Sequence, residues 1–291
     1  MLDLSERTML ANLTIKMWSA RKLDRKVTDK TNEDHGAKAD AGRYNKMLIS
    51  AKALEGLIQT SGAARRKHAA LTLPWLDDGS RILTTVGLDD YSRAMRNLRE
   101  EFEGEVESFL ETYQKHVTDA RGRLGDMFNE EDYPEAEEVR RRFHLDIALM
   151  PVAMAGDFRA EIDADLADGI RQDIERRTRD AIAEANRDAW RRVMEAVSHM
   201  ADRLKAYKPG EKGKRAEGVF KETLVTNVKE LIAVLPALDI KGEGELAAIA
   251  KRLERDLCQV DAKTLRENDN ARARTADRAA AIVAEVQQFM A

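Results

Sequence analysis

Few residues in this sequence have the types and spacing that enzyme or metal chemistry needs. The five histidines are scattered, no His-Glu-x-x-His pair occurs, and Cys258 has no second cysteine with which to hold zinc. A lone thiol within an apolar helical pattern is typical of a core residue rather than of a nucleophile. The sequence therefore predicts no catalytic residue, no cofactor and no metal ligand, and we expect a protein that is not an enzyme.

Two short motifs are similar to ligand-binding loops without completing them. The run DADLADG at 163–169 has the acids of a calcium loop, but its glycine comes one position late and the apolar helical pattern continues through it. Acids in the first turns of a helix explain the run, because they complement the helix dipole. The run GEKGKR at 210–215 has neither the spacing nor the preceding strand of a nucleotide-binding loop. We expect neither calcium binding nor ATPase activity.

Charge is distributed unevenly although the net charge is only −4. Between Asn12 and Ala70 there are thirteen Lys and Arg against six Asp and Glu, whereas between Asp89 and Glu138 there are six against sixteen. The basic residues that we expect to contact an anionic partner or another subunit are Lys16, Arg21, Lys22, Arg25, Lys26, Lys30, Arg65, Arg66 and Lys67. The acidic face that we expect to contact these basic residues comprises Glu100, Glu103, Glu107 and Glu111. Opposed patches of this kind favour contact between copies of the chain.

The same charges allow a second reading of the basic region. A basic surface with aromatic side chains is typical of proteins that bind or anneal single-stranded nucleic acid, and Trp18, Tyr44 and Trp75 are the candidate stacking platforms. The acidic composition of the whole chain counts against this alternative. The leading interpretation is a homo-oligomeric scaffold or adaptor, and nucleic-acid binding is the alternative.

One stretch, Asp157 to Tyr207, dominates the predicted architecture. Its apolar residues recur at helical spacing without a proline, starting with Phe158 and Ile162, and they predict one helix of about 75 Å. A helix of this length needs another long helix to cover its apolar stripe. The segment from Asp89 to Met127 has the same pattern, and the short connection between the two predicts antiparallel packing as a stalk.

Shorter patterns predict the remaining elements. Period-two alternation around Leu13, Ile82 and Ile147 predicts three strands that pair into a small sheet. We expect a polar, solvent-facing loop after the first strand and a helix over 37–70. The expected fold is mainly α: a sheet head with a long-helix stalk (1–207), a linker (208–218) and a C-terminal region of helical hairpins (219–291).

The environment of the protein can also be anticipated. The first residues, MLDLSERTML, lack the basic and apolar regions of a secretory signal, and no apolar run approaches the length of a membrane span. A single cysteine excludes an internal disulfide and suits a reducing compartment. We expect a cytoplasmic protein that does not enter a membrane.

Three stretches resemble a known family: Trp-Ser-Ala-Arg-Lys at 18–22, EEFEGEVESFLETY at 100–113 and RRRFHLDIALMPV at 140–152. They are similar to the domain of unknown function 3150 family of tailed bacteriophages and bacterial genomes, over roughly residues 2–159. The resemblance implies a phage-type protein of the host cytoplasm. It also implies a phage or host protein partner, such as an AAA-type ATPase or a host system to be countered. That family has no established reaction, so no catalytic residue is implied.

Overall fold

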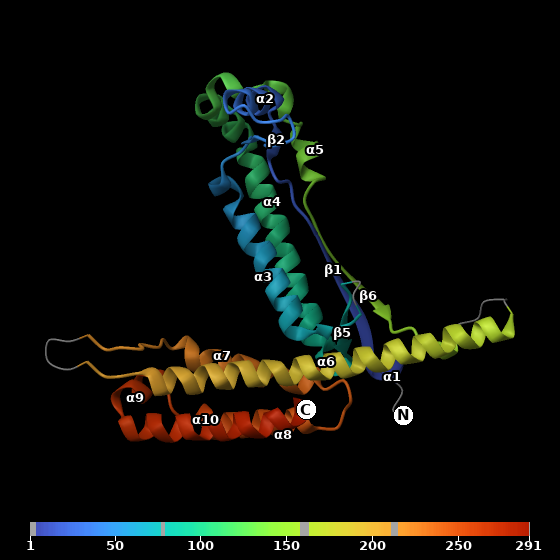
Figure 1. Ribbon diagram of the computed structural model, residues 1–291, viewed down its shortest axis with the longest axis vertical. Helices are drawn as coiled ribbons and strands as arrows, with labels where there is room; N and C mark the ends of the chain where they lie inside the picture. Colours follow the sequence, from blue (N-terminus) through green and yellow to red (C-terminus); the bar gives the residue numbers. More distant parts are fainter. Residues whose placement is uncertain (1–3, 77–78, 158–162, 211–214, 291) are drawn as a thin grey trace. The chain divides into compact units, whose positions relative to one another are not determined.

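The computed structural model describes residues 4–76, 79–157, 163–210 and 215–290. The predicted class is confirmed, because long helices and one small four-stranded sheet make up most of the chain (Figure 1). The chain divides into two compact units, and each is assembled from separate segments. Unit 1 comprises Met1–Asn12, Ala69–Ser92 and Ala148–Ala291, and unit 2 comprises Leu13–His68 and Arg93–Ile147.

The sheet confirms the three predicted strands and adds a fourth. Its order is β4 (Leu73–Pro74), β5 (Arg81–Thr84), β1 (Thr8–Lys16) and β6 (His144–Pro151). Strands β1 and β5 are antiparallel, with Thr8 opposite Thr84, and β5 also pairs antiparallel with β4. The sheet therefore joins stretches that lie far apart in the sequence, as the alternating patterns predicted.

Unit 2 contains the acidic helix that the sequence predicts. Helix α4 (Leu88–Leu124) begins with Asp89 and Asp90 in its first turn, where carboxylates complement the helix dipole. Helix α3 (Glu55–Leu71) and the short α5 (Ala136–Arg140) belong largely to the same unit. Gly56 of α3 leaves room for the Glu105 side chain of α4, which a Cβ at that position would meet.

An aromatic cluster forms part of the core of unit 2. The Trp18 ring meets the rings of Phe109 and Tyr113 edge-on, at centroid distances of 6.4 and 6.0 Å. Phe143 packs against Phe109 at 5.8 Å. The Tyr113 hydroxyl donates a hydrogen bond to the carbonyl of Pro134 at 2.8 Å, and burial raises the pKa of Tyr113 to about 12. Trp18 and Phe143, which belong to the stretches 18–22 and 140–152, thus pack in one core.

Two predictions in this unit are wrong. The segment expected to be a solvent-facing loop forms β2 (Arg21–Leu23) and helix α2 (Arg25–Asp34). The helix expected over 37–70 begins later than predicted: its first part is a loop that contains the strand β3 (Asn45–Met47), and a 3-10 turn follows before α3. Strands β2 and β3 pair antiparallel.

Buried polar side chains explain why an apolar pattern does not reveal α2. Asp24 caps its first turn by accepting from Val27 N at 3.1 Å. Thr28 accepts from Tyr44 N at 3.0 Å, and Asn32 donates to Ala39 O at 3.3 Å. These two side chains are buried and hold the following loop on the helix. Hydrogen bonding, rather than an apolar stripe, therefore fixes this element.

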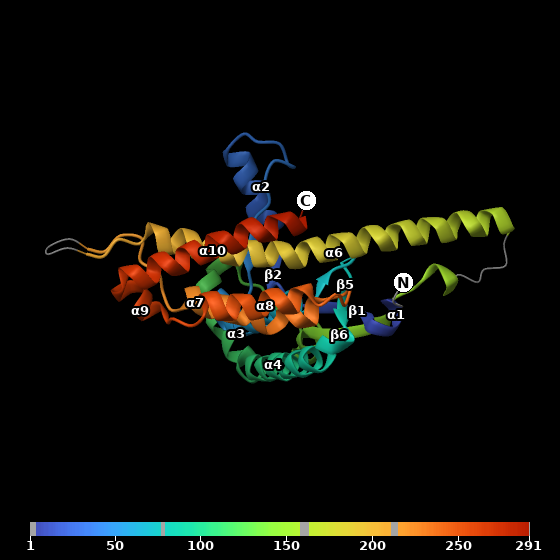
Figure 2. The same cartoon turned by 90° about the horizontal axis from the view of Figure 1, so that it is seen from below.

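Unit 1 is built around helix α6 (Ala164–Ala206), which matches the long predicted helix from its residue 164 onward. Phe158 and Ile162, where its apolar pattern was expected to begin, lie outside the described residues. Helix α10 (Asp269–Met290) packs along the second half of α6 (Figures 1 and 2). Arg272 lies over the Tyr207 ring at 4.9 Å and Phe289 stacks on Trp190 at 4.4 Å, so the two helices are antiparallel.

Three shorter helices complete the core of unit 1: α7 (Thr223–Val234), α8 (Glu245–Leu257) and α9 (Ala262–Glu267). The apolar residues of α6 in this core, which β4 also contacts, are Ala181, Ala185, Ala189, Trp190, Val193, Val197, Met200, Ala201 and Leu204. The C-terminal helices therefore cover α6, and the expected hairpin of α6 with the acidic helix is not how its stripe is buried. Apolar periodicity identifies a face that must be covered without identifying the surface that covers it.

The predicted linker also has a different place in the fold. Lys208 and Glu217 exchange two backbone hydrogen bonds of 3.0 Å, so the two ends of 208–218 are paired. Tyr207 and Phe220 pack edge-on on either side of this pairing, at a centroid distance of 5.3 Å. Within the described residues, this segment connects α6 to α7 inside unit 1 and does not separate two domains.

Candidate interaction surfaces

The predicted basic residues occupy two places in unit 2. Arg21, Lys22, Arg25, Lys26 and Lys30 are exposed on β2 and α2, and Lys16 is exposed at the end of β1. Arg65, Arg66 and Lys67 are exposed near the end of α3. In Figure 1, α2 lies above the upper end of α3, where that helix begins, whereas Arg65, Arg66 and Lys67 belong to its last two turns. The nine cations therefore do not form one continuous patch.

Lys22 belongs to a buried ion network that sequence reasoning did not find. Its Nζ lies 2.6 Å from Asp132 Oδ1, and Lys46 Nζ lies 2.7 Å from Asp132 Oδ2. Asp132 and Lys46 are 3% and 7% exposed, and Lys46 also donates to Met127 O at 2.7 Å. Burial favours the neutral carboxyl, but the hydrogen bonds and charges of both lysines outweigh it and hold the pKa of Asp132 below its ordinary value. These contacts fix β2 and β3 to the loop after α4.

The acidic face is exposed along α4, as predicted. Part of its negative charge is paired within unit 2, because Arg140 makes a bidentate contact with Glu107. Hydrogen bonding to Arg140 lowers the pKa of Glu107. Arg99 lies 3.9 Å from Glu103 on the same helix. Among the described residues, Glu100 and Glu111 have no cationic partner, so the unpaired charge of this face lies on those two residues.

Aromatic side chains are poorly placed for stacking on nucleic-acid bases. Trp18 and Trp75 are 6% and 4% exposed, so both rings belong to cores, and only Tyr44, 41% exposed, is accessible. Within the described residues no three His, Cys, Asp or Glu side chains are grouped to hold a metal ion. Cys258 is half buried at the end of α8, where burial raises the pKa of its thiol.

The acidic run at 163–169 is a helix start. Asp163 is the N-cap of α6, and its Oδ1 accepts hydrogen bonds from Asp165 N at 3.0 Å and Leu166 N at 3.4 Å. Capping is the ordinary role of an aspartate in this position. The apolar pattern that runs through it has a different significance, because Leu166, just beyond the cap, is exposed.

The first half of α6, Ala164–Asp180, extends past the helices that cover the second half (Figures 1 and 2). Its apolar residues Leu166, Ile170 and Ile174 continue the stripe at intervals of four residues. Leu166 is 58% exposed, and Ile170 and Ile174 are only half buried. An apolar stripe on one face of a helix is a surface that normally packs against another element. Among the described residues the 3-10 turn Ala155–Asp157 contacts α6 and Ala167 is buried, so the stripe is partly covered and stays accessible at Leu166 and, in part, at Ile170 and Ile174.

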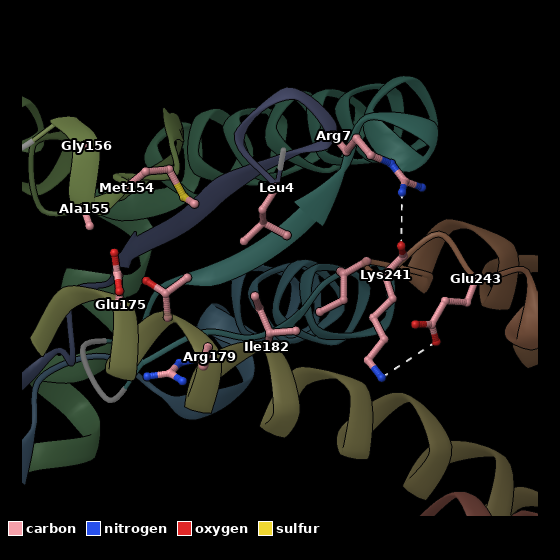
Figure 3. A pocket seen from close by; sticks show the side chains of 12 residues that line it. Leu4, Arg7, Met154, Ala155, Gly156, Glu175, Arg179, Ile182, Lys241 and Glu243 are labelled. Carbon is pink, nitrogen blue, oxygen red and sulfur yellow. Dashed lines mark hydrogen bonds and ion pairs between the residues drawn. The ribbon is translucent and has the colours of Figure 1, made fainter. Parts of the chain in front are cut away.

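A cavity of about 740 Å³ lies on another face of the same helix half. Leu4 and Ile182 point into it, and its rim carries Arg7, Glu175 and Arg179 (Figure 3). Arg7 is held in place by donating to Lys241 O at 3.1 Å. Successive residues of a helix turn by about 100°, so the cavity-facing residues of α6 are roughly 130° around the helix from the exposed stripe. The mixed charge of the rim favours neither an anionic nor a cationic ligand.

A second arginine cluster in unit 1 has a structural role. Arg192 donates to Ala70 O at 3.1 Å and Thr72 O at 2.8 Å, and Arg81 also donates to Thr72 O, at 2.9 Å. Both satisfy carbonyls at the end of α3, where cations complement the helix dipole. Burial, and then the charge of Arg192, lower the pKa of Arg81, and burial raises that of the neighbouring Tyr91. The cluster is explained by helix capping.

The comparisons give no relative from which a role could be transferred. No family model matches this chain, and no curated protein and no solved structure matches it. Within the described residues, no helix combines the length and the apolar character needed to cross a bilayer.

Proposed function

We propose that this protein is a non-enzymatic interaction protein that associates with copies of itself and serves as a scaffold or adaptor. The observation that supports this most directly is the exposed stripe of Leu166, Ile170 and Ile174 on α6. Covering one exposed large aliphatic side chain is worth roughly 1.5–3 kcal/mol, and less at Ile170 and Ile174, which are already half buried; the stripe is still a favourable docking surface. A phage-type setting with an ATPase or host partner is supported only by the sequence resemblance in residues 2–159.

The mass of the protein in solution tests this proposal. We expect a mass of at least two chains at high protein concentration and a fall toward one chain on dilution, measured by light scattering after size-exclusion chromatography. Replacing Leu166 and Ile170 with Asp should prevent association, because each carboxylate would have to be buried without a partner. Gln172→Asp is the control: it adds one of the two negative charges at an exposed position on the opposite side of the helix, and it should leave association unchanged. A wild-type protein that stays at the mass of one chain would exclude self-association.

Single-stranded nucleic-acid binding is the second candidate. It is supported by the exposed cations Arg21, Arg25, Lys26 and Lys30 on β2 and α2, which have no acidic partner in the described part of the chain. Fluorescence anisotropy with a labelled single-stranded oligonucleotide tests it. Binding through phosphates should weaken steeply with salt, with a logarithmic slope of about −0.7 for each phosphate contacted. The burial of Trp18 and Trp75 makes self-association the better supported function.

A further inference from the structure

We infer that two copies of this chain pair through the first half of α6 as antiparallel helices related by a two-fold axis at Ile170. This inference rests on the proposed self-association and specifies its geometry. It follows from three properties of the stretch Asp163–Arg177: the spacing of its residues, the face on which they lie and the signs of their charges.

The spacing is symmetric about Ile170. Leu166 and Ile174 lie four residues before and after it, and Asp163 and Arg177 lie seven residues before and after it. In a two-fold antiparallel pair, a residue a given number of positions before the axis faces the residue the same number of positions after it in the other copy. Ile170 therefore meets Ile170, Leu166 meets Ile174, and Asp163 meets Arg177. A helix that binds an unrelated partner has no need of such symmetry.

All five residues lie on one face of the helix. At about 100° per residue, they fall within an arc of about 80°, which is the width of one helix–helix contact. Asp165 and Glu175 would bring like charges together in this register, but each lies about 140° around the helix from the centre of that arc. The residues that face the other copy are therefore apolar in the middle and oppositely charged at the two ends.

The charges select the antiparallel arrangement. Arg177 is 65% exposed and pairs with Asp173 of its own helix at 2.6 Å, and exposed Asp163 uses one oxygen for the helix cap. Both can therefore accept an additional partner. Antiparallel pairing forms an Asp163–Arg177 contact at each end of the stripe. Parallel pairing in register would instead place Asp163 against Asp163 and Arg177 against Arg177, which is unfavourable.

A contact of this length is small for a protein interface, so we expect the dimer to dissociate on dilution. The apolar centre supplies the attraction and the charged ends determine the direction. These roles can be separated by experiment. A substitution at the apolar centre should weaken the dimer in any arrangement, whereas the effect of a charge substitution at the ends should depend on the charges of the other copy.

The first experiment locates the axis by crosslinking. In a Cys258→Ser background, which removes the native thiol, Ile170→Cys should give a covalent dimer with a short bis-maleimide, because the axis places this position next to itself. Gln172→Cys, two residues away on the opposite face, is the control and should remain largely monomeric on a denaturing gel. Efficient crosslinking at 172 and none at 170 would show that another face of α6 forms the contact.

The second experiment tests the direction by exchanging charges. Arg177→Asp alone and Asp163→Lys alone should each weaken dimerisation by about tenfold or more, because like charges then meet at both ends. Mixing the two variants should restore the wild-type dissociation constant, because every end of the mixed pair again joins opposite charges. Asp163→Asn keeps the capping oxygen and removes the charge, and this variant separates loss of the helix cap from loss of the contact.

The outcomes distinguish the inference from the function on which it rests. A wild-type protein that remains monomeric at all concentrations overturns both. A dimer that forms without crosslinking at 170, and whose charge variants do not recover on mixing, leaves self-association standing and overturns the antiparallel α6 contact. Crosslinking at 170 together with recovery on mixing supports both.

Discussion

Lys46 and Asp132 form an ion pair of 2.7 Å in which both side chains are buried. Removing one member of such a pair leaves an unpartnered charge, which typically costs about 3–5 kcal/mol. We therefore expect Lys46→Met to destabilise unit 2 by about 3 kcal/mol, measured by hydrogen exchange of α4 and β3. Lys22→Met is the control. It contacts the same carboxylate but is 52% exposed, so its loss should cost about 1 kcal/mol or less.

The same carboxylate predicts a pH dependence. Because the folded-state pKa of Asp132 lies below its ordinary value, its ionised form stabilises the fold. This contribution is complete above the ordinary carboxyl pKa of about 4 and is lost as the pH falls through the depressed folded-state value. Unfolding by urea at a series of pH values should show the decline in wild-type protein. Asp132→Asn should be less stable at neutral pH and should lose that component of the decline.

Trp190 connects α6 to the end of α10. Its ring is 1% exposed and stacks on Phe289 with an angle of 5° between the ring planes. Trp190→Ala should destabilise unit 1 by about 3–5 kcal/mol, because it removes a large buried side chain and leaves a cavity. Phe289→Ala should cost clearly less, since Phe289 is 41% exposed. Equal losses in thermal or urea unfolding would contradict the packing of α10 on α6.

The shared core of α6 and the C-terminal helices predicts how fragments behave. Val197 and Leu204 pack in the same core as Leu253 and Ile282, so neither side can be completed without the other. A fragment of residues 219–291 should be largely unfolded, with few protected amides by NMR. Adding residues 164–218 should restore protection. A stably folded 219–291 fragment would support the domain boundary that the sequence predicts at 208–218.

The exposed cations Arg21, Arg25 and Lys26 on β2 and α2 form a group that we call the basic head. Reversing their charges distinguishes self-association from nucleic-acid binding. Arg21→Glu, Arg25→Glu and Lys26→Glu should reduce the mass of assemblies at low salt if these residues contact the acidic face of another copy. Reversals at Glu100, Glu103 and Glu111 should partly restore it. Lys22 and Glu107 are left unchanged because both have partners within unit 2.

The matched control reverses Arg65, Arg66 and Lys67, which changes the same charge elsewhere on unit 2. We expect this control to leave the mass closer to that of the wild-type protein. A triple variant of the basic head that keeps its native mass but loses binding to a single-stranded oligonucleotide would favour the nucleic-acid alternative instead.

Sequence periodicity predicted the class of the fold, the three main strands and the extents of α4 and most of α6. The apolar pattern of this helix includes both Ile170 and Val197, and it does not show which of the two is covered by other helices. Only the first is left partly exposed, since α10 reaches no further than the region of Trp190.

The features that the sequence did not reveal depend on contacts between distant residues. Helix α2 was missed because buried Thr28 and Asn32 hold its loop by hydrogen bonds, and such bonds have no periodic pattern. The Lys46–Asp132 pair joins a strand to a loop more than eighty residues away. Its two members lie in stretches where the sequence shows only an excess of one charge, and nothing in that excess indicates that these two residues pair.

The interleaving of the two units has a consequence for synthesis on the ribosome. Both segments of unit 2 have been synthesised once Ile147 has been added. Unit 1 cannot be completed until α10 has been synthesised, long after its segment Ala69–Ser92. At about 5–20 residues per second, that wait is on the order of 10 seconds. During this time Leu73, Trp75 and Ile82, which belong to the core of unit 1, have no completed surface to cover them. The nascent chain should therefore be a substrate for chaperones until its last helices emerge.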